Sequence, residues 1–317
     1  MVAENSGNID NENLLSSDES TASTYTMAML ARILSVPQST LRRWYLRGLL
    51  IPTRKVNRLP YFDFTQVVAA RNLARLISGS SSSQAIERQL TRLSKTRTGW
   101  QSTLADLDVV VDGVTVLVRE NDERLVDAFG QFRLDFYSDE YQSGGDSVLK
   151  FSPAIEAKVD HNVPDSLDDL LQAALEYEDN QNPLAAIDVY RRMMQSYGPT
   201  ADSAFALAEV FYAAGDLVAA RERYYLAVEL DNGFIEARAN LGCVLVELGE
   251  LEAARVEFEK ALRIHPDYPD VHFHLAKLLD RLDQELLAIR HWERFLELAP
   301  RTPWSDEARE RLSRTSD

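Results

Sequence analysis

The 317-residue sequence contains one cysteine, Cys243. A single cysteine excludes an intramolecular disulfide framework and a cysteine-rich metal site, and it fits a reducing compartment. No apolar run approaches the roughly eighteen residues that span a bilayer, and residues 1–17 lack the basic and apolar regions of a signal peptide. We therefore expect a cytoplasmic chain with no membrane partner.

Patterns of catalytic and metal-binding residues are also missing. His272 and His274 lie two apart in a helical pattern and cannot share a metal face, and the other histidines have no partner at ligand spacing. Cys243 has no recognisable base, which favours a small packed residue. We expect no enzyme, no metal site and no cofactor.

Acidic residues outnumber basic ones, 50 to 34, and give a net charge of −16, but the basic residues are concentrated in one segment. Residues 25–98 carry thirteen Lys and Arg against only Asp63 and Glu87, a net charge of +11. Residues 1–24 have five acidic and no basic side chains, and the chain beyond residue 98 is acidic. A basic block inside an acidic chain is typical of a domain that binds phosphates.

Composition and periodicity divide the chain into four segments. Residues 1–24 are too poor in apolar side chains to offset the entropy of ordering, which predicts a disordered acidic tail. Residues 25–98 form the basic domain. Residues 99–166 read as a β-containing connector and linker: two strands flank the turn at 112–113, and residues 131–136 could supply a third. Residues 167–317 are repetitive.

A period of 34 residues runs without insertion from Leu167, with further blocks starting at Ala201, Ile235 and Pro269. The eighth position of each block is Ala or Gly, the twentieth is Ala, and the twenty-fourth is Tyr, Phe or Trp. Small residues let paired helices approach closely, and the aromatic ring fills the space beside them. The pattern resembles the tetratricopeptide repeat (TPR), which implies an α-solenoid of four helix pairs, with a capping helix at 303–314.

The TPR resemblance also implies a concave groove lined by the first helix of each pair. Only one of the twelve groove positions is lysine, which does not suit an acidic carboxyl terminus, whereas the aromatic and acidic side chains suit an amphipathic or basic segment of a protein or peptide partner. A scaffold surface without a single guest stays open as the alternative. The groove candidates are Leu171, Phe205, Glu209, Tyr212, Phe273 and Lys277.

The basic domain opens with two helical patterns joined by a short turn at 35–37. Thr26 can cap the first, which runs to Leu34, and Gly48 can end the second in a left-handed conformation. Residues 49–55 and 59–62 then predict the two strands of a wing, and two helices with capping-box spacing follow, to residues 77 and 93. In the second helix Leu41 and Trp44 or Tyr45 should face inward, and the expected outward side chains are Gln38, Ser39, Arg42 and Arg43.

This order of elements, with the run TLRRWYLRGLLIP at 40–52, resembles the winged helix-turn-helix DNA-binding domain of the MerR family. The resemblance implies that the second helix reads the major groove of double-stranded DNA through Gln38, Ser39 and Arg42. Arg43, Arg47 and the wing would then contact the phosphate backbone. Arg also offers bidentate bonds to guanine or phosphate. The DNA-binding candidates are Gln38, Ser39, Arg42, Arg43, Arg47, Arg54, Lys55, Arg58 and Tyr61.

Two features depart from typical members of that family. The helical pattern ends at residues 95–99, where those members continue into a long helix that pairs two subunits, so a homodimer is left open here. The cysteine loop that senses metals in some members is absent.

The fold class expected is thus mainly α, with a winged helix-turn-helix domain, a small β segment and a TPR solenoid. Two functions follow from it. The first is a DNA-binding transcription regulator whose repeats bind a protein partner. The alternative is a TPR scaffold or adaptor whose basic head binds protein or RNA. Because exposed charges are screened beyond about 8 Å at physiological salt, we expect only weak competition between the acidic repeats and DNA for the head.

Overall fold

The structure is a computed structural model that describes residues 24–78, 83–96, 104, 109–112, 115–119, 125–127, 132–133 and 166–314. The predicted tail before residue 24 and the predicted linker up to residue 165 lie outside these residues. Within them the chain is mainly helical, as predicted. We call residues 25–96 the head and residues 166–314 the solenoid.

The head contains the predicted helix-turn-helix and wing. Helices α1 (Met27–Leu34) and α2 (Gln38–Leu46) are followed by the antiparallel pair β1 (Arg54–Val56) and β2 (Leu59–Tyr61), and then by α3 (Phe64–Ser78) and α4 (Ser83–Thr96). The Thr26 hydroxyl accepts the Met29 N–H and caps α1 as predicted. Gly48 follows α2 with a φ of 73°, the left-handed conformation that glycine adopts without strain.

One predicted capping box is only half formed. Asp63 accepts the N–H of Gln66 at 3.0 Å, which starts α3. The Gln66 side chain does not complete the box, because its Oε1 accepts the N–H of Ile51 instead. A tertiary hydrogen bond to the chain before the wing has replaced the local one.

The core of the head extends into the connector. Its fully buried side chains include Leu30, Leu41 and Trp44, so Trp44 faces inward as predicted. The connector strands β3 (Val109–Asp112), β4 (Thr115–Arg119), β5 (Leu125–Asp127) and β6 (Phe132–Arg133) form one antiparallel sheet in chain order. Strand β5, three residues long, was not predicted. The connector residues that join the core of the head are Leu104, Val109, Val116 and Val118.

The solenoid consists of four helix pairs and a last helix, as predicted. The first helix of every pair begins at the first residue of a 34-residue block, so the sequence period and the structure share one register. The pairs are α6 (Leu167–Asp179) with α7 (Pro183–Tyr197), α8 (Ala201–Ala213) with α9 (Leu217–Leu230), α10 (Ile235–Glu247) with α11 (Leu251–Ile264), and α12 (Pro269–Arg281) with α13 (Glu285–Leu298), followed by α14 (Ser305–Ser313).

The small and aromatic positions of the repeat meet inside each helix pair. The alanines at the eighth and twentieth positions are fully buried, and so are Tyr190, Tyr224, Phe258 and Trp292. In the third pair, a Cβ added to Gly242 would lie 2.4 Å from Cε1 of Phe258. This contact explains why glycine stands where the other repeats have alanine.

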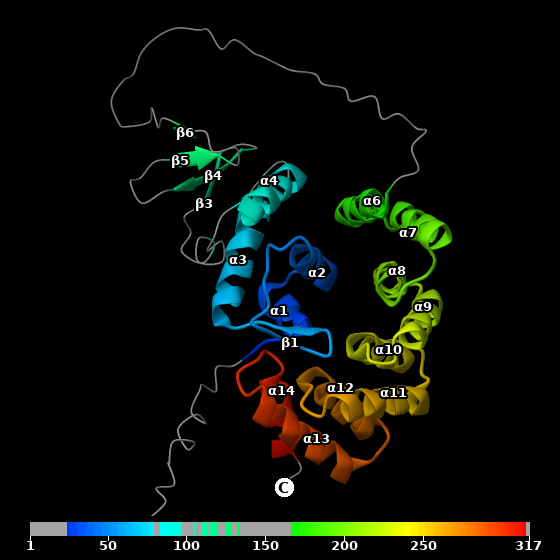
Figure 1. The fold of residues 1–317 in the computed structure, drawn as a ribbon. Helices are drawn as coiled ribbons and strands as arrows, with labels where there is room; N and C mark the ends of the chain where they lie inside the picture. Colours follow the sequence, from blue (N-terminus) through cyan, green and yellow to red (C-terminus); the bar gives the residue numbers. More distant parts are fainter. Residues whose placement is uncertain are drawn as a thin grey trace, which may run out of the picture.

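The solenoid curves around the head, as Figure 1 shows, so that α1, α2 and the wing lie on its concave side. Three head side chains, Met29, Leu59 and Tyr61, belong to the same buried cluster as the core of the solenoid. The two parts are therefore packed together. No helix in the described ranges is both long and apolar enough to cross a membrane.

Candidate nucleic-acid interface and the groove that covers it

The second helix of the head points its predicted DNA-reading side chains at the solenoid. Arg42 Nη2 donates to Glu236 Oε1 at 2.6 Å, and Gln38 Nε2 donates to the same oxygen at 3.4 Å. The Arg42 guanidinium also lies over the ring of Phe205, 3.9 Å from its centroid. Although burial opposes its charge, the Glu236 and Glu209 carboxylates raise the pKa of Arg42, which stays protonated.

The wing makes a second contact with the solenoid. Arg58, at its tip, pairs with Asp202 and with Asp231, the latter at 2.7 Å, and its guanidinium lies 4.7 Å from the ring centroid of Phe234. At the base of the wing, the Tyr61 hydroxyl lies 2.6 Å from Nε2 of His265. Both ends of the hairpin are therefore fixed to the concave side.

Helix α1 provides a third contact. The hydroxyl of Thr26 donates to Oδ2 of Asp270 at 2.6 Å while it also caps α1. Arg32 lies over the ring of Trp304, 5.7 Å from its centroid. Burial raises the pKa of Asp270 to about 7, the hydrogen bond from Thr26 opposes that rise, and the charge of Glu236 adds to it.

Arg43 does not face outward, contrary to the prediction. Its guanidinium is buried and donates two hydrogen bonds to Glu87 of α4, at 3.1 and 3.0 Å. Glu87 also accepts the indole N–H of Trp44 at 2.6 Å and pairs with Arg47. Because a buried carboxylate requires such partners, these residues hold α2 against α4. The sequence analysis gave Glu87 no role. The feature that could have identified it is that Glu87 is one of only two acidic residues in the basic segment.

The remaining DNA-binding candidates lie near the groove or stack within the head. Ser39 lines a cavity between the head and the solenoid. Arg54 lies over the ring of Tyr61 and Lys55 over that of Tyr45, and both basic residues are exposed. The structure thus bonds Gln38, Arg42, Arg58 and Tyr61 to the solenoid. A direct role in DNA binding remains a prediction for all nine residues.

The groove candidates divide into four groups. Phe205 and Glu209 lie beneath the head, and Glu209 accepts hydrogen bonds from Tyr224 and Asn240. Phe273 is buried and stacks on Trp304, with ring centroids 4.9 Å apart, so the end of the solenoid covers it. Leu171 packs at the edge of the solenoid core. Tyr212 and Lys277 line the cavity that remains open.

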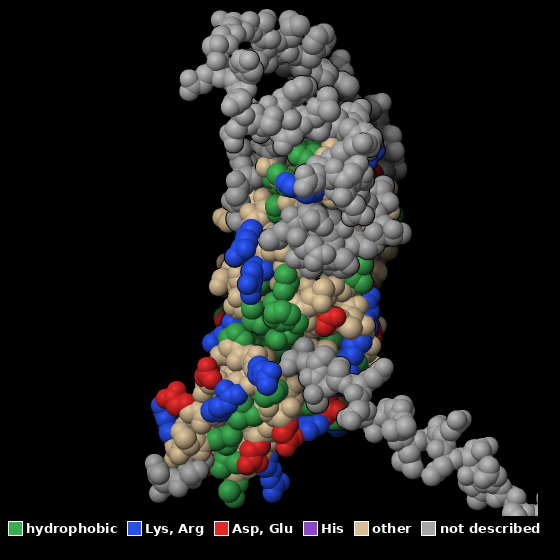
Figure 2. All heavy atoms as spheres, turned by 90° about the vertical axis from the view of Figure 1, so that its left-hand side faces the viewer, with side chains coloured by type: hydrophobic (Ala, Val, Ile, Leu, Met, Phe, Trp, Pro, Cys, Tyr) green, Lys and Arg blue, Asp and Glu red, His purple; other side chains and the backbone are tan. Residues whose placement is uncertain are grey.

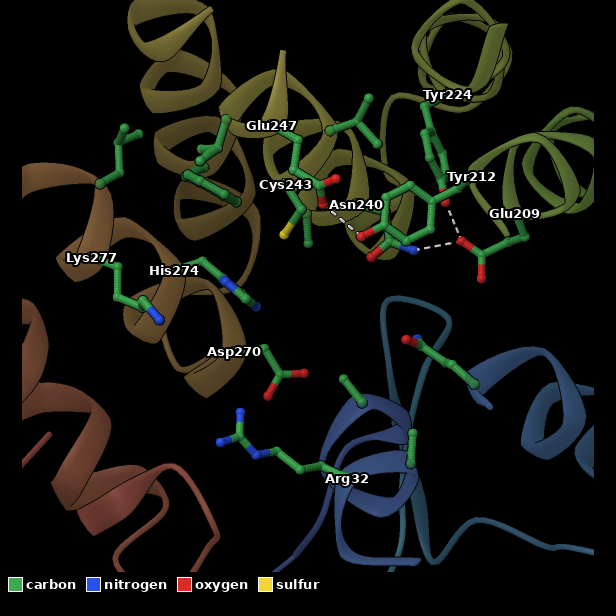
Figure 3. Close-up of a pocket in the computed structure, with 18 of the residues that line it drawn as sticks. Arg32, Glu209, Tyr212, Tyr224, Asn240, Cys243, Glu247, Asp270, His274 and Lys277 are labelled. Atoms are coloured by element: carbon green, nitrogen blue, oxygen red, sulfur yellow. Dashed lines mark hydrogen bonds between the residues drawn. The ribbon is translucent and has the colours of Figure 1, made fainter. Parts of the chain in front are cut away.

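That cavity has a volume of about 600 Å³ and lies between α1, the start of α2 and the concave helices α8, α10 and α12. Figure 3 shows Tyr212, Cys243, His274 and Lys277 on the solenoid side and Arg32 on the head side. Burial raises the pKa of Cys243 to about 12 and lowers that of His274 to about 4. The thiol and the imidazole are therefore both neutral at pH 7.

Three buried side-chain atoms in the described part of the chain lack a hydrogen-bond partner: Arg42 Nε, Asp270 Oδ1 and Trp304 Nε1. All three belong to side chains at the contact between head and solenoid. A buried polar group without a partner costs about 1–3 kcal/mol. Among the described residues, the buried polar atoms at this contact are therefore less completely hydrogen-bonded than those inside the head or the solenoid.

The face of the head that does not contact the solenoid carries a mixture of side chains. Figure 2 views the side of the molecule that lies on the left in Figure 1, where the end of the solenoid is also visible below the head, and Lys and Arg there are separated by hydrophobic and other side chains. The exposed hydrophobic residues of the head include Ile51 and Phe64. Among the residues that the structure places, no group of three or more His, Cys, Asp and Glu could hold a metal ion.

Comparison with known families identifies both halves of this arrangement. Residues 25–93 match the model of the MerR HTH family regulatory proteins, residues 171–233 match a tetratricopeptide repeat model, and residues 242–283 match a second TPR repeat model. The chain thus carries a MerR-type helix-turn-helix domain and TPR repeats, and both are non-enzymatic kinds of domain.

Individual relatives cover smaller parts of the chain. The CTR9 homolog of Arabidopsis thaliana is 31% identical over 111 residues, which is 33% of this chain and 10% of that protein. The crystal structure of MamA covers 43% of this chain and 79% of its own, with 21% identity and a TM-score of 0.41. That of YrrB, described as a TPR protein with an unusual peptide-binding site, covers 46% and 75%, with 18% identity and a TM-score of 0.42.

Proposed function

We propose that this chain is a DNA-binding transcription regulator of the cytoplasm, in which the head binds double-stranded DNA and the solenoid binds a protein partner. One observation carries the DNA half of the proposal. Gln38 and Arg42 of α2 and Arg58 and Tyr61 of the wing all contact the same side of the solenoid, so they share one surface of the head. A helix and a wing that present polar and basic groups together are what the major groove and its flanking phosphates require.

The protein-binding half rests on the concave face of the solenoid. This face holds a helix end and a hairpin through acidic and aromatic side chains, which is a way of recognising protein. A partner with arginines on a helix or hairpin fits the same chemistry. No step of this function needs catalysis.

The alternative is an adaptor whose head binds protein and never DNA. The observation in its favour is that the candidate DNA-binding face contacts a protein surface in this structure. The two functions differ in their response to duplex DNA, so a binding measurement separates them.

The experiment is a selection of bound sequences from a random duplex library, followed by affinity measurements at several salt concentrations. The fragment used should start at residue 25 and continue past β6, because Leu104, Val109, Val116 and Val118 complete the core of the head. Counterion release should make affinity fall steeply with salt, and Arg42→Ala should weaken binding by about 1–3 kcal/mol if Arg42 reads a base. No binding to any duplex at low salt would favour the adaptor.

A further inference from the structure

We infer that the solenoid is a built-in inhibitor of the head: its concave face binds the surface that the head presents to DNA, so that solenoid and DNA compete for the same side chains. This inference rests on the proposed function and adds its regulation. It commits to one occupant of the groove, the head of the same chain.

The first argument is that the contacts exclude each other. Arg42 cannot place its guanidinium on a base or phosphate while it is bonded to Glu236 and stacked on Phe205. The same holds for Arg58 between Asp202 and Asp231. The solenoid carboxylates occupy the guanidinium donors that phosphate oxygens would use, so release must precede the DNA contacts of both residues.

The second argument is that the contact is specific and more than a general attraction between opposite charges. Only 19% of the Arg42 side chain is exposed, and its carboxylate partner Glu236 is buried. Hydrogen bonds fix three separate parts of the head: Thr26 before α1, α2 through Arg42, and the wing through Tyr61. Buried pairs are screened by salt much less than exposed ones. The sequence-based expectation of weak competition assumed exposed, screened charges. Because Arg42 and Glu236 are largely buried, we infer a stronger competition between the solenoid and DNA.

The third argument is that the contact can open. Its unpaired atoms, Arg42 Nε and Asp270 Oδ1, would regain water on release, which offsets part of the lost interaction. Arg58 and Asp202 remain largely exposed, so the wing contact is accessible to competing ions. The cavity of about 600 Å³ leaves part of the groove free beside α1. A protein partner can therefore reach Tyr212 and Lys277 before the head leaves.

Cys243 provides a probe of this opening that does not depend on DNA binding. It is the only cysteine in the chain, and it lines the cavity together with Ala28 and Ser39 of the head. Departure of the head would remove one wall of the cavity and admit water and reagent. The rate at which the thiol reacts with a disulfide reagent, in the intact full-length chain, therefore reports the docked fraction.

The test uses a triple variant of the full chain that removes only solenoid carboxylates: Asp202→Asn, Asp231→Asn and Glu236→Gln. Its matched control removes three carboxylates that pair with arginines of their own helices on α11 and α13: Glu252→Gln, Glu259→Gln and Glu297→Gln. Both variants change the net charge equally and leave every head residue in place. A difference between them therefore reports docking and not net charge.

We expect the triple variant to react faster at Cys243 and to bind duplex DNA more tightly than the wild type, within the range of about 5- to 150-fold typical of coupled sites. The control should match the wild type in both measurements. Because coupling is reciprocal, saturating duplex should raise the thiol reaction rate of the wild type as well. If the triple variant does not fold, Glu236→Gln alone and a salt titration of the wild type give the same comparison.

Three results would overturn the inference, and each has a different meaning. An unchanged thiol rate in the triple variant would show that the head is not held by these carboxylates. A faster thiol rate with unchanged duplex affinity would show docking without inhibition. A faster thiol rate with no duplex binding in any variant would remove DNA as the competitor, and with it the proposed function, while the docking itself would stand.

Discussion

Two neighbouring arginines of α2 have opposite surroundings. Arg43 turns into the head and shares the buried carboxylate of Glu87 with Trp44 and Arg47. Arg42, one residue earlier, turns outward and bonds Glu236 of the solenoid, with one of its nitrogens left without a partner. We call Arg43 with Glu87 the inner pair and Arg42 with Glu236 the outer pair.

The difference shows that the same two residue types can serve two purposes. Glu87 of the inner pair binds three residues, Arg43 and Trp44 of α2 and Arg47 directly after it, so these bonds can be lost only if the head unfolds. The outer pair joins two parts, and most buried side chains of the head form a cluster of their own. Its loss requires that the two parts move apart, which also exposes Met29, Leu59 and Tyr61, but neither part has to unfold. We therefore regard the inner pair as structural and the outer pair as reversible.

The largest expected effect comes from breaking the inner pair. Glu87→Gln leaves Arg43 buried without a counter-charge and should lower the free energy of unfolding of the head by about 3–5 kcal/mol. Glu236→Gln, the same change in the outer pair, should release the head with little loss of its stability. Denaturant unfolding followed by circular dichroism compares the two variants, and equal losses would contradict the distinction.

A smaller effect should follow from overpacking the solenoid at a distance from both arginines. Gly242→Ala places a Cβ 2.4 Å from the ring of Phe258 and should cost about 1–3 kcal/mol. Adding Phe258→Leu should recover part of that loss, because the smaller side chain makes room. A thermal unfolding curve unchanged by Gly242→Ala would contradict the close contact between α10 and α11 at Gly242 and Phe258.

The outer contact should also depend on pH through Asp270. Its pKa rises from 3.8 to about 7 in the docked structure, so docking favours the protonated form. The contribution of protonated Asp270 to docking is full below pH 3.8 and is lost as the pH rises through 7. The docking equilibrium constant changes by at most about tenfold per pH unit. Of the groups that act on its carboxyl, Thr26 does not titrate and the charge of Glu236 adds to the rise. His274, which lines the same cavity, has a pKa of about 4 and stays neutral above pH 6.

The measurement is duplex affinity of the full chain at pH 6 and at pH 8. The comparison is with Asp270→Asn, which keeps the shape of the side chain and cannot ionise. Because ionised Asp270 weakens docking, the wild type should bind DNA more tightly than Asp270→Asn, by a larger factor at pH 8 than at pH 6. A constant ratio between the two proteins would rule out Asp270 as the source of any pH dependence.

The smallest effect is expected at the wing, where two arginines can be compared. Arg58 pairs with the solenoid at an exposed position, and Arg54 stacks on Tyr61 inside the head. An exposed ion pair contributes about 0.2–1 kcal/mol, so Arg58→Ala should raise the Cys243 reaction rate by up to about fivefold. Arg54→Ala should leave that rate unchanged, and equal rates in the two variants would show that the wing contact does not hold the head.

Local patterns in the sequence determined the helices and their order. The Thr26 cap, the Gly48 stop and the 34-residue register each depend on residues only a few positions apart or on spacing repeated along the chain. Strand β5 was missed because three residues are too few to show a period. The inward turn of Arg43 was missed because its partner, Glu87, lies 44 residues away.

The contact between head and solenoid was decided only by the tertiary structure. Its hydrogen bonds join residues 194 and 244 positions apart, as in Arg42 with Glu236 and Thr26 with Asp270. The sequence by itself determined that a basic head and acidic repeats share one chain. It could not show which carboxylate faces which arginine, or how deeply the pair is buried, because burial depends on how the surfaces of head and solenoid fit together, and no local pattern records that fit.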